Sequence, residues 1–478
     1  MSRFLELLEP LMRALPEVTR PTRPVTFREK LFWTGLILTI YLIMCEIPLY
    51  PLSLTRSVYE PFFFLRMIFA SKRGTLAELG IGPIVTAGLI FQLLVGSKII
   101  DVDLTNPRER ARFTGGQKLF AFIFIFLEAG IYAFGGVYGS LPLWASFVIF
   151  LQLVAASTII LLLDELVQKG WGIGSGVSLF IAAGVAQQIF WLCFSPFTMD
   201  DGLPLGALNA LLVSLASLVR VGDYSVLFKA LSRPHGLPDV TGLIAMILTF
   251  LVIMYLEGVR IELPVVHARY GGLRARIPLK FLYVSNVPVI LAAALMANLH
   301  MLANVLWSRF PGASWLRYFA EYETKDNSRV LVGGLLYYIS PPRGLVEVAQ
   351  NPFRAIAYTI FFVIMCIFFA IAWVETSGMD PRSQAEQLVQ AGLQIPGFRK
   401  STKIIASILE RYIPILSIAS GFVVGLIAAL ADMFGALGSG MGILLLIDIL
   451  LQYQTLILQE RALEMYPMLR RLVGTRRV

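Results

Sequence analysis

Charged residues, cysteines and histidines are scarce in this sequence, and each shortage excludes a class of protein. Asp, Glu, Lys and Arg make up 15% of the 478 residues, and there are three Cys and three His. A soluble globular protein carries about 25% charged residues, so this chain lacks the charges for a surface in water. The cysteines, Cys45, Cys193 and Cys366, lie far apart without a Cys-x-x-Cys pair, and we expect small buried apolar side chains.

Motifs for catalysis and for metal or cofactor binding are missing as well. There is no Gly-x-x-x-x-Gly-Lys phosphate loop and no His-Glu-x-x-His pair, and the three histidines are too scattered for a zinc site. Ser175 and Ser439 stand between glycines, a pattern that would suit an intramembrane serine protease, but only His300 lies at membrane depth to activate them. We therefore expect no catalytic residue, no metal, no cofactor and no enzymatic activity.

Long apolar runs dominate what is present. Hydrophobic residues make up 57% of the chain and its mean hydropathy is +0.74, which indicates an integral membrane protein. A membrane span needs about 20 mostly apolar residues. Ten segments meet this requirement, near residues 31–50, 76–97, 118–137, 142–163, 173–194, 240–258, 286–307, 353–374, 412–433 and 440–459.

The even number of spans places both termini on one side of the membrane, and the charges indicate which side. With the termini inside, the inner segments carry 27 Lys and Arg and the outer segments 13, so the positive-inside rule favours cytoplasmic termini. We expect no removable signal peptide in residues 1–16, which lack an apolar core of that type. Their apolar residues recur at helical spacing between charged ones, which predicts a helix on the membrane surface.

Three loops stand out. The cytoplasmic loops near 260–285 and 376–411 are unusually basic, which suits either contact with anionic lipid or a landing site for a large polyanion. On the outer side, Glu60-Pro61 can open a helix, and the apolar run 62–70 is too short to span. A short re-entrant helix fits this segment, because non-spanning backbone in a membrane must line a cavity or be buried in protein.

The two halves of the chain carry an internal repeat. Gly-Ser-Gly opens the fifth span at 174–176 and the tenth at 438–440, and a proline stands near the start of the second and seventh spans. Apolar residues follow at matching distances: Ile181 and Leu445 after the glycines, Val85 and Ile290 after the prolines. Five spans followed by five more are inverted relative to each other, which places the functional site between the halves near the midplane.

This pattern predicts an all-α integral membrane protein with ten transmembrane helices as two inverted five-helix halves. Its parts are an amphipathic cytoplasmic N-terminal helix and tail (1–30), the first half (31–194), an external loop (195–239), the second half (240–459) and a basic cytoplasmic tail (460–478).

Polar residues at membrane depth are costly unless they are satisfied. Thr86, Glu128 and Asn298 lie within the second, third and seventh spans. Each is either a hydrogen-bonded structural residue or a functional one, and for Glu128 the functional alternatives are a proton or ion relay and a latch between helices. Asp448 in the tenth span has no obvious partner in the sequence, and His300 or Arg66 are our only suggestions.

Several motifs resemble the SecY family, the large subunits of the Sec protein-conducting channel, in the archaeal and eukaryotic branch. They are GTLAELGIGPIVTAGLI at 74–90, LDELVQKGWGIGSG at 163–176, LYVSNVP at 282–288, YISPP at 338–342 and ADMFGALGSG at 431–440. The resemblance implies a central pore that conducts secretory polypeptides. It also implies a lateral gate between the second and third spans on one side and the seventh and eighth on the other, which releases membrane segments into lipid.

The resemblance assigns residues to these parts. The apolar pore ring falls on Ile81, Val85, Val177, Ile181, Ile290 and Leu445, and the polar cluster of the gate on Thr86, Glu128 and Asn298. The plug corresponds to about 57–70, the expected short re-entrant helix, and its assigned residues are Pro61, Phe62, Phe63, Phe64, Leu65, Arg66 and Met67. A ring of branched aliphatic side chains contacts a passing polypeptide without binding it and dewets when empty, which blocks ions.

The resemblance also implies partners. The basic loops match ribosome-binding loops, so the expected polyanion is ribosomal RNA, contacted by Arg269, Arg274, Arg276, Lys280, Arg399, Lys400 and Lys403. Gly271 and Asp448 depart from the family pattern. Two single-span subunits, SecE-like (gamma) and beta, would complete a heterotrimer that receives signal sequences and nascent chains. We expect an archaeal cell membrane in preference to the endoplasmic reticulum.

A secondary transporter is the main alternative, since it too predicts inverted repeats and an ion site at Glu128. A transporter needs polar, substrate-matched side chains at the midplane, whereas this sequence offers six aliphatic ones.

Overall fold

The computed structural model describes residues 9–465 with gaps. The gaps are residues 13, 24, 53–70, 97–106, 136–137, 139–140, 199–201, 222–223, 234–236, 268–272, 285–286, 311–312, 326–327, 343, 391–392 and 395–400. The predicted plug, Arg269, Gly271, Arg399, Lys400 and the end of the basic tail therefore lie outside the described residues.

Each of the ten predicted spans coincides with a helix. These are α2 (Phe27–Glu46), α4 (Gly82–Gly96), α5 (Pro107–Phe134), α6 (Leu143–Gln168), α7 (Gly176–Phe194), α10 (Val240–Gly258), α11 (Val287–Arg309), α15 (Pro352–Thr376), α18 (Ile413–Met433) and α19 (Gly440–Met465). Within the described ranges, eight helices are long and apolar enough to cross a membrane. Of the other two, α4 contains a shorter apolar helix and α2 carries charges at both ends. The predicted all-helical membrane part is therefore confirmed.

Local sequence explains where several of these helices begin. The side chain of Thr26 accepts a hydrogen bond from the backbone of Glu29 (3.3 Å), and the Glu29 carboxylate accepts one from Thr26 (3.2 Å), which is a complete capping box for α2. Asp239 accepts from the backbone of Gly242 (2.7 Å) at the start of α10. As the repeat predicts, α7 and α19 begin at the second glycine of each Gly-Ser-Gly.

The loops contain strands that the sequence analysis did not anticipate. Strands β1 (Arg260–His267), β2 (Leu273–Lys280) and β5 (Leu393–Gln394) form an antiparallel sheet in the order β2–β1–β5, and β3 (Glu321–Lys325) pairs with β4 (Ser328–Gly333). Because β5 pairs with β1 at Val266↔Gln394 and His267↔Leu393, the two basic loops meet in one sheet.

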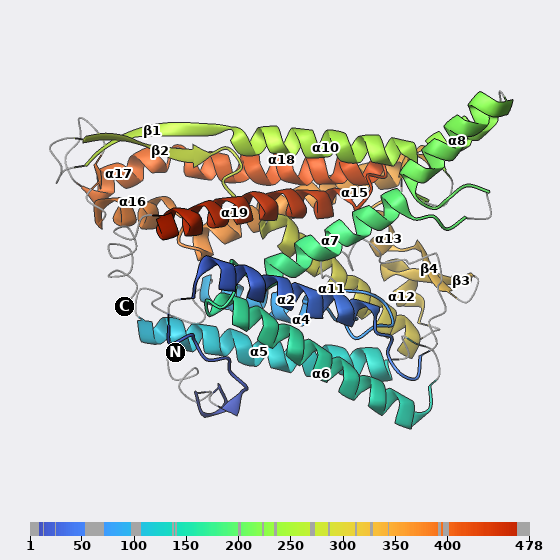
Figure 1. Cartoon of the computed structure of the whole chain (residues 1–478), viewed down its shortest axis with the longest axis horizontal. Coiled ribbons are helices and arrows are strands. Elements are labelled where there is room, and N and C mark those ends of the chain that lie inside the picture. Colours follow the sequence, from blue (N-terminus) through green and yellow to red (C-terminus); the bar gives the residue numbers. More distant parts are fainter. Residues whose placement is uncertain are drawn as a thin grey trace.

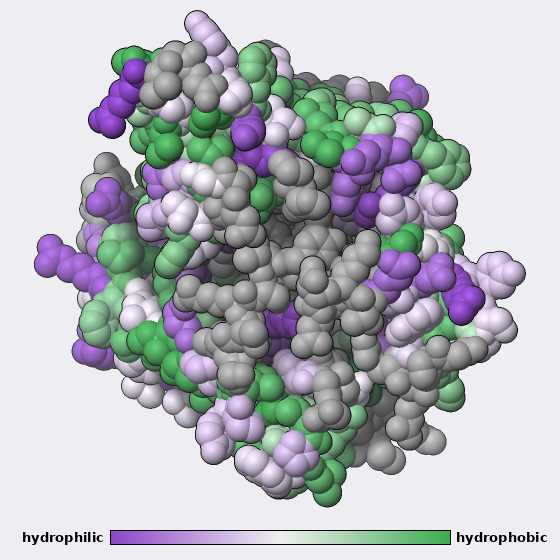
Figure 2. Space-filling view, turned by 90° about the vertical axis from the view of Figure 1, so that its right-hand side faces the viewer, coloured by the Kyte–Doolittle hydropathy of each residue, from purple (hydrophilic) through white to green (hydrophobic). Residues whose placement is uncertain are grey.

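Short helices complete the loops. They are α8 (Ala207–Val221) and α9 (Tyr224–Leu231), α12 (Ser314–Phe319), α13 (Leu335–Ile339), α14 (Gly344–Gln350), α16 (Pro381–Gln390) and α17 (Thr402–Leu409). In Figure 1, β1, β2, α16 and α17 lie at one end of the long helices, whereas α8, α12, β3 and β4 lie at the other. The loops that we assigned to opposite sides of the membrane are thus at opposite ends. Figure 2 views the end with α8, β3 and β4, where many hydrophilic residues reach the surface.

The long helices form two layers that follow the repeat. Helices α2, α4, α5 and α6 lie together in the lower part of Figure 1, and α10, α15, α18 and α19 in the upper part. The layers meet where α7 and α2 contact α19 and where α4 contacts α11 and α15. The largest apolar cluster of the described residues fills this junction, with buried side chains from both halves.

Part of the N-terminal segment packs on the protein. Glu9–Met12 is helical, Met12 packs against Phe91 at the end of α4, and Leu15 joins a cluster with Ile125 of α5. The apolar side of this segment therefore faces the helical bundle at these two residues.

Candidate pore ring and gate cluster

Four helices bring the six predicted ring residues to the junction of the halves. Ile81 and Val85 stand at the start of α4, Val177 and Ile181 in α7, Ile290 in α11 and Leu445 in α19. All six belong to the same apolar cluster: Ile81, Ile181 and Leu445 are at most 1% exposed, and the other three are partly buried against them. The internal repeat therefore selected residues that the fold gathers into one apolar cluster.

Every ring residue lies close to the N-terminal end of its helix. The carbonyl of Ile81 accepts the backbone N–H of Val85 (3.0 Å) as α4 begins, and Ile290 is three residues into α11. Val177 is the second residue of α7, and Leu445 is the sixth of α19. Helix starts from both halves therefore define the place where the aliphatic side chains meet.

The helix starts of α7 and α19 depend on two residues that the sequence analysis missed. Asp164 of α6 accepts a hydrogen bond from the backbone of Val177 (2.9 Å), and Asp432 of α18 accepts one from Gly440 (2.7 Å). Both aspartates are buried. The signal was present, because each precedes a Gly-Ser-Gly in a family motif, but the motif alone did not assign a role to the carboxylate.

The three residues of the predicted gate cluster lie on neighbouring helices. Thr86 of α4 and Glu128 of α5 are buried and Asn298 of α11 is half-buried, and α4 contacts both α5 and α11. In the part of the chain that the structure describes, no hydrogen bond joins these three side chains to one another. Their role as a latch therefore stays a prediction.

Two further polar residues at membrane depth have partners. Asp448 accepts a hydrogen bond from the side-chain amide of Gln452, one turn along α19 (2.8 Å), which the sequence analysis did not suggest. The Nε2 atom of His300 lies 3.1 Å from the hydroxyl of Ser340, which links α11 to the YISPP motif. His300 thus contacts a serine other than the two between glycines.

The described basic residues of the two basic loops lie on or near the three-stranded sheet. Arg276 of β2 is exposed and pairs with Glu262 across the hairpin (2.7 Å), and Lys280 pairs with Glu257 (3.1 Å). Arg274 lies in β2 opposite Val266, and Lys403 is exposed in the first turn of α17. These four positions share one end of the molecule.

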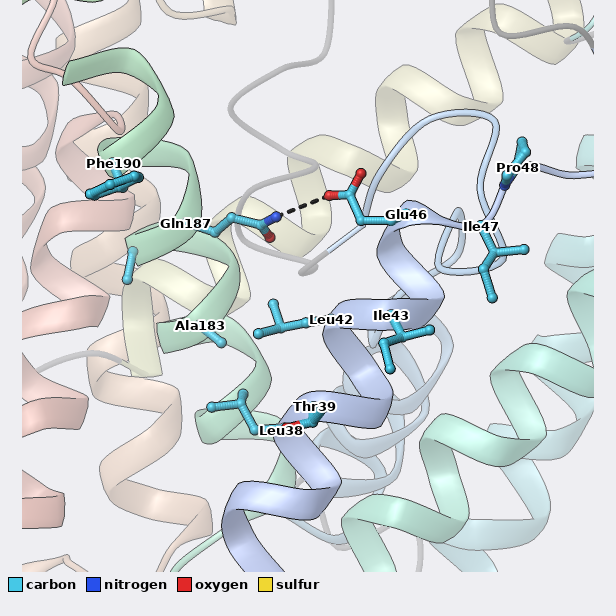
Figure 3. A pocket seen from close by; sticks show the side chains of 11 residues that line it. Leu38, Thr39, Leu42, Ile43, Glu46, Ile47, Pro48, Ala183, Gln187 and Phe190 are labelled. Atoms are coloured by element: carbon cyan, nitrogen blue, oxygen red, sulfur yellow. Dashed lines mark hydrogen bonds between the residues drawn. The ribbon is translucent and has the colours of Figure 1, made fainter. Parts of the chain in front are cut away.

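A groove of about 810 Å³ opens between α2 and α7 (Figure 3). Leu38, Leu42 and Ile43 line it from α2 and Ala183 and Phe190 from α7, so its wall is largely apolar. At its outer end the side-chain amide of Gln187 donates to the Glu46 carboxylate (3.1 Å), which also pairs with Lys72 (2.5 Å). The groove therefore has an apolar body and a polar rim.

Comparison with known proteins finds similarity along nearly the whole chain. The SecY family model matches residues 75–454, and a model for the plug domain of Sec61p matches residues 40–74. The protein translocase subunit SecY of Saccharolobus solfataricus is 41% identical over 98% of this chain and 99% of its own. A solved protein-conducting channel superposes with a TM-score of 0.79 and 41% identity, covering 96% of this chain and 98% of its own.

Sec61 in the canine ribosome–channel complex from the endoplasmic reticulum is similar to the same extent. It superposes with a TM-score of 0.77 at 40% identity and covers 96% of this chain and 98% of its own. Since a family model covers most of the chain and the similarity extends over nearly its full length, the chain belongs to the SecY family.

Proposed function

We propose that this SecY-family chain is the pore-forming subunit of a protein translocase. It conducts secretory polypeptides across the membrane between its two halves and has no ATPase of its own. The observation that carries this proposal is the gathering of six branched aliphatic side chains, from four helices of both halves, in one apolar cluster. Such a ring has no polar group with which to retain a substrate, and it dewets when the channel is empty.

The lateral gate lies where α4 and α5 of the first half face α11 and α15 of the second. Contacts of α4 with α11 and α15 support this position, because these contacts join the two halves. A signal segment leaves sideways because lipid favours each leucine or isoleucine by a few tenths of a kcal/mol. Thr86, Glu128 and Asn298 form the polar latch of this gate.

A ribosome binds the cytoplasmic end. The exposed Arg276, Lys280 and Lys403 support this contact, and the sheet that joins β1 to β5 brings the two basic loops together. Their affinity for ribosomal RNA comes from neutralised phosphates and released counterions. The translating ribosome drives the polypeptide through the pore, because the chain has no ATPase of its own.

Two single-span subunits, SecE-like and beta, complete the complex. The SecE-like subunit binds in the groove between α2 and α7. A transmembrane helix fits there because the wall is apolar at membrane depth, where a polar partner would lose hydration. Gln187 and Glu46 at the outer rim provide polar contacts near the interface.

The chain is a multi-pass membrane protein, and we assign it to the cell membrane of an archaeon with both termini cytoplasmic. The start of α2 and the end of α19 are adjacent, since the backbone of Phe27 donates to the Glu464 carboxylate (2.9 Å) and Lys30 pairs with Glu460 (2.6 Å). The excess of Lys and Arg on this side supports its cytoplasmic assignment.

Site-specific photocrosslinking tests the pore. A probe is placed in turn at Val85, Ile181, Ile290 and Leu445, and a stalled secretory nascent chain is supplied on ribosomes. We expect crosslinks to the nascent chain from all four positions and none from Leu248, which is 61% exposed on the outer surface of α10. Absence of crosslinks from the four positions in an engaged complex would refute the pore ring.

A further inference from the structure

The starts of α7 and α19, the fifth helix of each half, are each preceded by a glycine in the left-handed conformation. Gly174 has φ 78° and Gly438 has φ 93°, each two residues before its helix. This left-handed conformation is readily adopted only by glycine. The two halves therefore share the conformation of this glycine, whereas the next residue differs, since Ser175 is extended (φ −123°) and Ser439 is left-handed (φ 57°).

A buried carboxylate from the preceding helix caps each start. Asp164 accepts from the backbone of Val177 through Oδ1 (2.9 Å) and from the side chain of Gln168 through Oδ2 (2.8 Å). Asp432 accepts from the backbone of Gly440 through Oδ1 (2.7 Å) and from the hydroxyl of Tyr358 through Oδ2 (2.9 Å). The first N–H groups of a helix have no partner within it, so a buried start needs such acceptors.

Glycines allow these helix starts to press against the helices that cap them. A Cβ atom on Gly176 would lie 2.5 Å from Cα of Asp164, and one on Gly440 would lie 2.1 Å from the carbonyl oxygen of Ala428. Each helix start also contacts the other of these two helices: Gly174 packs on Tyr453 of α19, and Gly438 packs on Ile189 of α7. Neither helix start has space to rotate while its cap is in place.

Three of the six ring residues follow these caps directly. Val177 donates the capping hydrogen bond to Asp164 through its own backbone, Ile181 lies one turn further, and Leu445 lies five residues after Gly440. We infer that Asp164 and Asp432 are a symmetric pair of positioning residues that set the rotation and depth of α7 and α19 and so hold the ring closed. This inference rests on the proposed function of the ring.

The two caps differ in the helix that supplies their second hydrogen bond. The second partner of Asp164 lies on its own helix, whereas Tyr358, the second partner of Asp432, lies on the gate helix α15. Asp432 therefore connects the start of α19 to the lateral gate, and the first half has no counterpart of this connection among these hydrogen bonds. Tyr358→Phe breaks it while leaving the Gly440 cap.

The test measures ion flux through idle channels in liposomes together with crosslinking from probes at Ile181 and Leu445. Asp164→Ala and Asp432→Ala each remove one acceptor, and we expect about tenfold higher ion flux from each, the order of effect of an unsatisfied buried N–H. Asp164→Asn and Asp432→Asn keep an acceptor oxygen, so their ion flux should be as low as that of the unsubstituted chain. Ser420→Ala, which removes a buried hydroxyl that bonds within α18, is the matched control and should stay sealed.

The outcomes separate this inference from the pore proposal. If the unsubstituted chain gives nascent-chain crosslinks from Ile181 and Leu445 but the alanine variants seal as well as it does, the positioning role is wrong and the pore stands. If the unsubstituted chain gives no crosslinks, the pore itself is wrong. If an alanine variant does not fold, the inference still requires Tyr358→Phe to raise ion flux, and an unchanged seal in that variant would overturn the link from Asp432 to the gate.

Discussion

At the scale of single residues, we predict that polar groups at the junction of the halves set how readily the proposed gate opens. Replacing Glu128 or Asn298 with leucine substitutes apolar contact for a polar group, which should stabilise the closed gate. Burying a polar group without a hydrogen bond costs about 1–3 kcal/mol, and each leucine in a signal contributes a few tenths, so a signal would need several more leucines to open the gate. Transport of signals with graded hydrophobicity measures this threshold.

The matched control is Phe126→Leu, at an exposed position of the same helix as Glu128. This variant should leave the threshold unchanged. An unaltered threshold in Glu128→Leu and Asn298→Leu as well would contradict the latch.

The second prediction at this scale concerns the charges that hold the N-terminal segment. Lys169 pairs with Glu17 and with Glu165 (2.9 Å), and Glu165 also pairs with Lys118 (2.8 Å). The hydrogen bond from Lys169 lowers the pKa of Glu17 below its ordinary value of 4.5, against a smaller opposing effect of burial. A lowered carboxylate pKa stabilises the docked segment above the ordinary value, and this contribution is lost as the pH falls through the lowered pKa.

A spin label at Arg20, which is exposed, reports whether the segment is docked. Its mobility should increase as the pH falls through the lowered pKa of Glu17, where this carboxylate becomes protonated. In Glu17→Gln the label should already be more mobile near neutral pH and change less on acidification. Identical titrations of the two proteins would show that the ion pair does not hold the segment.

At the scale of secondary-structure elements, the proposed ribosome contact depends on the hairpin β1–β2, which carries exposed positive charge. Replacing Arg276, Lys280 and Lys403 together with glutamine should weaken ribosome binding. The slope of log affinity against log salt should fall by roughly 0.7–0.9 for each phosphate group that the variant no longer neutralises. Ribosome co-sedimentation over a series of salt concentrations measures both effects.

Arg317→Gln is the control, because Arg317 is exposed on α12 at the other end of the molecule. Its affinity and slope should match those of the unsubstituted chain. If the triple variant also keeps both, the ribosome contacts other residues.

The elements also show where sequence reasoning succeeds. The ten spans were predictable because about 20 consecutive apolar residues are a strong and local signal. Strands β1 and β2 carry a weaker signal, and the pairing of β1 with β5 joins residues more than 120 positions apart, which no local pattern reveals. The partner of Asp448 was missed for the opposite reason, since Gln452 lies at ordinary helical spacing whereas the suggested partners were distant in sequence.

At the scale of the whole molecule, the repeat predicted where the ring residues lie better than it predicted the contacts that hold them there. The matched distances from glycine and proline identified Ile181, Leu445, Val85 and Ile290, which the fold gathers in one cluster. The caps on α7 and α19 depend on contacts between helices, and the Tyr358 link exists on one side only. A repeat read from sequence indicates what the halves share, and three-dimensional packing determines where they differ.

The sheet that joins the two basic loops has a mechanical consequence. Its strands β1 and β2 connect α10 to α11, and β5 lies in the connection from α15 to α18, so four of the five helices of the second half are tethered to it. A load applied to this sheet is shared among four helix ends. In the proposed complex, a ribosome bound to this sheet would therefore tilt these helices together.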